Sequence, residues 1–215
     1  MAVEAEAGET RLQREWWLRS LAVLVAPRAV FAALREKARE DVEARQEPLL
    51  AIVYLAGIAG VLASSVAGRL YDDPEIDAPL VAVWAFIAGG IYGFATYFVA
   101  GAAVYVGTRG LGSLGSYRRA RHVLGFAAVP LALSLALWPV RLALYGGDSF
   151  RSGGSDSGAG GDVFTVLTLA FAAWSLGLLA VGLKTVHGWS WARSLAALGL
   201  VGAVLAAFAV LPTLF

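Results

Sequence analysis

The side chains that could do chemistry in this sequence are few, and their spacing does not form a catalytic group. The chain has no cysteine and only two histidines, His122 and His187, so thiolate chemistry is excluded and a histidine-rich metal site is unexpected. Ser64, Ser65 and Ser134 have no base near them in sequence, and we expect them to bond backbone carbonyls. We therefore expect no enzymatic activity, no cofactor and no metal.

Arg141 is the charged residue that falls inside a long apolar stretch, residues 123–145. A charge within a membrane segment is a candidate for function by default, so one interpretation is a role in a substrate pathway or in gating. The other interpretation is that the long side chain reaches the interface past Tyr145. No acid lies inside any predicted span to pair with it.

Basic and aromatic residues gather in two other segments. A basic cluster before residue 123 can bind anionic lipid headgroups, at roughly 1 kcal/mol per basic residue, or can simply set the topology. An apolar run after residue 15 is too short to span and is typical of an interfacial helix. The candidate headgroup or partner contacts are Trp16, Trp17, Arg19, Arg118, Arg119 and Arg121.

Hydrophobic residues make up 59% of the chain and charged residues 15%, against about 25% charged residues in soluble domains. The missing charge indicates surface that faces lipid. Residues 79–107 carry no Asp, Glu, Lys, Arg or His and exceed the about 20 apolar residues that cross a bilayer core. The spare length predicts a tilt, or a bend near Gly89 and Gly90.

The predicted fold is an all-α polytopic membrane bundle of five transmembrane helices with an N-terminal amphipathic cytoplasmic helical segment. We expect a disordered tip over 1–15, amphipathic and charged helices over 16–48, and a five-helix domain over 49–215. The expected spans are about 49–68, 79–107, 123–145, 163–183 and 194–215. Prolines 130 and 139 should interrupt the third. A four-span arrangement with the last segment re-entrant stays open.

The connecting segments differ in composition. Residues 108–122 form a predicted loop with four arginines and no acid, whereas residues 146–162 are rich in Gly, Ser and Asp and are expected to be flexible. In the N-terminal segment, Trp17, Leu21, Leu24 and Val25 share one predicted helical face, and Val30, Phe31 and Leu34 continue an apolar face after Pro27. A signal peptide is the alternative, but acids precede the segment and no small-x-small site follows.

The distribution of basic residues predicts the orientation. Of the 17 Lys and Arg, 14 fall before residue 49 or in the second and fourth loops, and two, Arg69 and Arg151, fall in the first and third loops. By the positive-inside rule the N-terminus is cytoplasmic and the C-terminus extracytoplasmic.

Small residues recur four apart within the predicted spans and favour close helix packing, within the chain, with a second copy or with another membrane protein. These residues are Gly89 with Gly93, Ala173 with Gly177, and Gly199 with Ala203 and Ala207.

Three stretches together resemble the Yip family of Ypt/Rab-interacting membrane proteins, in its prokaryotic form. They are Pro27-x-x-x-Phe31 with Pro48 before the first span, Ser116-Tyr117-Arg118 leading to Gly125 and Pro130, and Trp174-Ser175-Leu176 continuing through Gly182 to Gly188. The likeness covers roughly residues 18–210. It implies five spans, no catalysis, and a role like that of eukaryotic relatives, which bind Rab-type GTPases and act in vesicle traffic.

The family's acidic Asp-Leu-Tyr-Gly-Pro signature before the first span is absent here apart from Pro48, which argues against GTPase binding. The Ala-, Gly- and Arg-rich composition suggests a bacterial or archaeal source and a plasma-membrane location. We expect a protein that binds partners or organises the membrane, in contact with lipid and not with nucleic acid. The alternative is a small transporter or channel subunit, suggested by Arg141 and the interrupted third span.

Overall fold

The computed structural model describes residues 18–36, 47–64, 72 and 78–210, and in these ranges the ordered elements are helices. The predicted all-α class is therefore confirmed for the described residues. The predicted tip over 1–15, Trp16, Trp17 and the charged stretch over 37–46 lie outside them. The elements are α2 (Pro27–Glu36), α3 (Glu47–Leu62), α5 (Ala78–Gly110), α6 (Tyr117–Ala127), α7 (Val129–Ser134), α8 (Leu137–Tyr145), η1 (Gly147–Phe150), α9 (Ala159–His187) and α10 (Trp191–Val210).

Three of the predicted spans have the length and composition to cross a membrane: Pro79–Gly110, Tyr117–Tyr145 and Ala159–His187. The first and last spans are represented by the shorter apolar helices Leu49–Leu62 and Trp191–Ala207 among the described residues, so five spans stay a prediction. Large apolar side chains such as Ile91 (69% exposed) and Val166 (64%) cover the outer faces. Surface of this kind is what lipid would cover.

Helices α3 and α5 cross with their backbones nearly touching. A Cβ placed on Gly57 of α3 would lie 2.1 Å from the carbonyl oxygen of Gly89, and one on Gly93 would lie 2.5 Å from that of Val53. Small residues thus allow this contact, as the spacing of Gly89 and Gly93 predicts. Helix α5 runs through Gly89 and Gly90 without interruption over 33 residues, about 50 Å.

The other two predicted packing faces do not face a neighbouring helix in this structure. Ala173, Gly177, Gly199 and Ala203 are exposed, and a Cβ on Gly177 or Gly199 would meet nothing within 4 Å.

The third span is interrupted as predicted. It consists of α6, α7 and α8, with Pro130 in the first turn of α7, where the missing N–H costs least. Ser134 Oγ donates to the carbonyl of Leu131 at 2.7 Å, and Ser64 Oγ donates to that of Val61 at 2.8 Å. Both serines therefore bond backbone carbonyls, as expected.

Two loop predictions need correction. The loop predicted over 108–122 is much shorter, because α5 continues to Gly110 and α6 begins at Tyr117. Ser116 caps α6 by accepting a hydrogen bond from the Arg119 amide at 3.2 Å, so the arginines lie on a helix. The loop predicted over 146–162 is also shorter, because residues 147–150 form η1 and α9 begins at Ala159. Within it, Ser155 Oγ donates to the Tyr145 carbonyl at 2.6 Å and the Ser155 amide to Asp148 Oδ2 at 3.0 Å.

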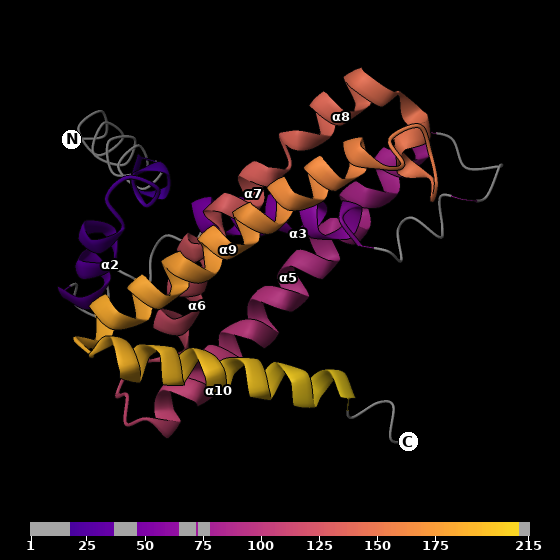
Figure 1. Ribbon diagram of the computed structural model, residues 1–215. Coiled ribbons are helices and arrows are strands. Elements are labelled where there is room, and N and C mark those ends of the chain that lie inside the picture. Colours follow the sequence, from indigo (N-terminus) through magenta and orange to yellow (C-terminus); the bar gives the residue numbers. More distant parts are fainter. Residues whose placement is uncertain (1–17, 37–46, 65–71, 73–77, 211–215) are drawn as a thin grey trace, which may run out of the picture.

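The buried core lies where α2, α6 and α9 meet. Phe31 and Leu183 are fully buried and Val123 is 1% exposed, and a Cβ on Gly182 would lie 2.8 Å from Val123 and 3.0 Å from Phe31. In Figure 1, α2 packs beside the C-terminal part of α9, while α10 departs from α9 and passes beside the C-terminal part of α5.

Candidate functional site

The two ends of the bundle carry opposite charge. Among the described residues from 49 onward, the acids are Asp72, Asp148, Asp156 and Asp162. Asp72 accepts a hydrogen bond from the Ser152 amide at 2.7 Å, so these acids lie at the end where α9 begins. At the other end α5 and α9 finish, and α6 and α10 start (Figure 1). Basic side chains lie at this other end, and we call them together the basic end. They are Arg35, Arg109, Arg118, Arg119, Arg121, Lys184, His187 and Arg193.

A hydrogen-bonded contact joins the two turns of the basic end. Arg193, in the first turn of α10, donates from Nε and from a terminal nitrogen to the carbonyl of Leu111, between α5 and α6. Its guanidinium carbon lies 4.4 Å from the ring centre of Trp189, which stacks at 4.5 Å on His187. Gly188 ends α9 in the left-handed conformation, with φ of 64°, so the turn geometry favours glycine.

Three of the predicted headgroup or partner contacts, Arg118, Arg119 and Arg121, lie on α6. Arg121 packs against three aromatic rings. Its guanidinium carbon lies 4.7 Å from the ring centre of Tyr117, 4.8 Å from Phe98 and 5.5 Å from Tyr97. Arg121 Nε is buried without a hydrogen-bond partner in the described structure. Cation–π contact of this kind holds the charge beside α5.

Arg118 and Arg119 lie on the same helix as Arg121. Both are half-buried on the first turn of α6, and the Arg118 carbonyl is 2.8 Å from Nδ1 of His122. His122 itself is fully buried, so it belongs to the core. His122 is thus the buried member of the predicted cluster, whereas its three arginines are half-buried.

The N-terminal candidates are only partly described. Arg19 is half-buried, and beside it Leu18, Leu21 and Val25 are exposed by 58%, 59% and 86%. Of the predicted apolar face, Leu21 and Val25 therefore point outward, whereas Leu24 packs against the core.

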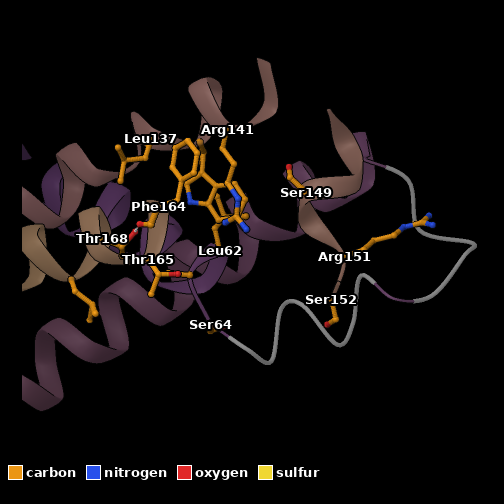
Figure 2. Close-up of a pocket in the computed structure, with 13 residues that line it drawn as sticks. Leu62, Ser64, Leu137, Arg141, Ser149, Arg151, Ser152, Phe164, Thr165 and Thr168 are labelled. Carbon is orange, nitrogen blue, oxygen red and sulfur yellow. Dashed lines mark hydrogen bonds between the residues drawn. The ribbon is translucent and has the colours of Figure 1, made fainter. Parts of the chain in front are cut away.

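Arg141 lines a cavity of about 380 Å³ at the opposite end of the bundle. The walls come from the end of α3, from α8, from the start of α9 and from the segment that begins at η1. Figure 2 shows Arg141 beside Leu62 and Phe164, whereas the head of Arg151 extends away from them. We call this cavity the Arg141 pocket.

An acid from the third loop binds Arg141. Arg141 Nε donates to Asp156 Oδ2 at 2.6 Å, and a terminal nitrogen contacts the same oxygen. The Asp156 side chain is 5% exposed and that of Arg141 is 23% exposed. Sequence reasoning missed Asp156, because it searched for a partner within the spans and assigned this loop to flexible chain. Three aspartates in that loop are the only signal, and nothing in the sequence distinguishes Asp156.

The residues that carry the family resemblance serve the fold. Phe31, Gly182 and Val123 form one packed junction, Ser116 caps α6, and the hydroxyl of Tyr117 donates to the Phe98 carbonyl at 2.9 Å. These residues therefore stabilise the helices and their packing.

The described helices and their apolar surfaces define the class of this protein as an α-helical membrane protein. Its family follows from comparison with known families: a family model, the Yip1 domain, matches residues 21–211, so the chain belongs to the Yip family. Neither a curated protein nor a solved structure matches the chain.

Proposed function

We propose that this Yip-family chain is a non-enzymatic integral membrane protein that binds partners or organises the membrane, with its basic end in the headgroup layer of the cytoplasmic leaflet. Five spans, a cytoplasmic N-terminus, an extracytoplasmic C-terminus and a prokaryotic plasma membrane form part of this proposal.

The observation that carries the proposal is the convergence of cations from five helices at one end. Lys184 lies 5.3 Å from the ring centre of Trp191, and Arg109 lies 5.5 Å from that of Tyr105. Aromatic rings and basic side chains at the same depth are typical of a membrane interface. Anionic headgroups would add roughly 1 kcal/mol of attraction for each basic residue near the surface.

A second contact with the membrane would come from the N-terminal segment. Leu18, Leu21 and Val25 are exposed, while Val23 and Ser20 beside them are buried. An apolar face of this kind can lie at the boundary between headgroups and acyl chains.

Single-charge variants test the basic end. We expect Arg118→Gln and Arg119→Gln each to weaken phosphatidylglycerol binding by about fivefold, because each removes roughly 1 kcal/mol of attraction. The control is Arg69→Gln, which removes one charge from the first loop. Binding is measured by native mass spectrometry of the full chain in detergent, at two salt concentrations. Equal losses in all three variants would contradict the proposal.

The alternative of a small transporter or channel subunit stays a prediction from sequence. Arg141, one of its two motivations, has an ion-pair partner outside the span, so its presence has an explanation that needs no transported solute.

A further inference from the structure

The Arg141 pocket lies at the end of the bundle opposite the basic end and has the size of a ligand site. Its volume is about 380 Å³, and pockets for small molecules commonly measure about 300 to 1,000 Å³. It is lined by four separate segments, so a ligand could touch residues from α3, α8 and α9 together.

The Arg141 guanidinium can contact an anion in the pocket. Among the described lining residues Arg141 and Arg151 carry charge, and the head of Arg151 extends away from the others (Figure 2). Asp156 binds Arg141 through one oxygen, Oδ2, which takes Nε and one terminal nitrogen. A guanidinium has five N–H donors, so donors remain for a ligand, and their planar arrangement suits the oxygens of a phosphate group.

The guanidinium is fixed before any ligand arrives. Its carbon lies 4.7 Å from the ring centre of Trp138 and 5.9 Å from that of Phe164, while Asp156 holds the other side. A side chain that is already ordered loses little conformational freedom on binding. Asp156 therefore acts as a positioning residue for Arg141.

The rest of the lining is apolar and continues onto the outer surface. Leu62, Leu137 and Leu169 line the pocket, and Leu169 is 62% exposed on the same helix as Val166. A free phosphate would gain nothing from these side chains, whereas an acyl chain would bury apolar area against them.

We propose that the Arg141 pocket binds the phosphate group of an anionic amphiphile such as a phospholipid, with Arg141 as the anion contact and the α3 and α9 leucines along its chains. This site is separate from the basic end and does not rest on the function proposed above.

A matched pair of variants tests the pocket without disturbing the ion pair. Thr165 lines the pocket and Val166 is its exposed neighbour. We expect Thr165→Trp to fill the space and weaken phosphatidylglycerol binding about tenfold, the equivalent of one charge-assisted hydrogen bond. Val166→Trp should stay within about twofold of the unmodified chain. Arg141→Lys keeps the charge but loses the planar donors, and should also weaken binding about tenfold.

The measurement is native mass spectrometry of the full chain with phosphatidylglycerol, phosphatidylcholine or inorganic phosphate. Weaker binding of phosphatidylcholine, and no displacement of phosphatidylglycerol by millimolar phosphate, would support the proposal. Equal affinity in Thr165→Trp and Val166→Trp would overturn the site. Displacement by phosphate would overturn the amphiphile and assign a free anion. The difference within the pair is unaffected by Arg118→Gln, so the two proposals can fail separately.

Discussion

At the scale of single residues, the pairing of Arg141 explains how a cation is accommodated at the end of a membrane helix. The sequence leaves two interpretations of Arg141 open, a role in a pathway or a side chain that reaches the interface past Tyr145. In the structure the side chain binds an acid 15 residues further on and lies close to two aromatic rings. An ion pair shielded from water costs desolvation but is expensive to break, because one charge is then left without its partner.

Replacing Asp156 should therefore destabilise the protein. We expect Asp156→Asn to lower the free energy of unfolding by about 1–3 kcal/mol, since Arg141 loses its charged acceptor. Asp162→Asn is the control, because Asp162 is exposed in the first turn of α9 and should cost at most about 1 kcal/mol. Unfolding in mixed detergent, followed by circular dichroism, measures both.

The double variant Arg141→Gln/Asp156→Asn completes the comparison. If the two residues act as a pair, the double variant should cost less than the sum of the single variants. Strict additivity would mean that the two side chains contribute independently.

At the scale of helices, glycine placement distinguishes the contacts that hold this bundle together. The spacing of small residues four apart predicts three packing faces, on α5, α9 and α10, and does not favour one over the others. Only the face of Gly89 and Gly93 meets another helix closely among the described residues, because α3 offers Gly57 at the matching height. That match depends on how α3 and α5 align with each other. The spacing of small residues within one segment does not predict this alignment.

A substitution pair measures this contact. Gly57→Ala should destabilise the protein by about 1–3 kcal/mol, since the new Cβ would collide with the α5 backbone. Gly177→Ala meets open space and should be neutral or stabilising by up to about 1 kcal/mol, because alanine favours the helix. Both are read from the same detergent unfolding curves. A loss of stability in Gly177→Ala equal to that in Gly57→Ala would contradict the assignment.

Much of the helical architecture was accessible from sequence, and its limits have physical causes. Apolar length predicts α5 and α9, and Pro130 predicts the break before α7, since both signals are local. The ends of helices were harder to predict from sequence. The sequence predicts a loop at Thr108, Arg109 and Gly110, whereas α5 includes all three residues. The folded third loop escaped prediction because its order comes from contacts with Tyr145 and Arg141, residues outside the loop itself.

At the scale of the whole molecule, the separation of charge suggests one orientation in the membrane. The described acids from residue 49 onward lie where α9 begins, together with Arg141 and Arg151, whereas the residues of the basic end lie where α9 finishes. Each loop was assigned to a side by counting arginines, and the fold brings loops with the same assignment together: Arg193 of the fourth loop binds the Leu111 carbonyl of the second. Charge bias and contact thus agree on which connections share a face.

Thiol labelling tests this orientation, because the chain contains no cysteine of its own. Leu114, in the turn between α5 and α6, is 93% exposed, and Ser157, in the third loop, is also exposed. With the basic end in the cytoplasm, an impermeant maleimide applied to intact cells should label Ser157→Cys and spare Leu114→Cys. Permeabilised cells should label both variants, which controls for reactivity. Labelling of Leu114→Cys alone in intact cells would reverse the orientation, and labelling of both would mean that α6–α8 does not span as proposed.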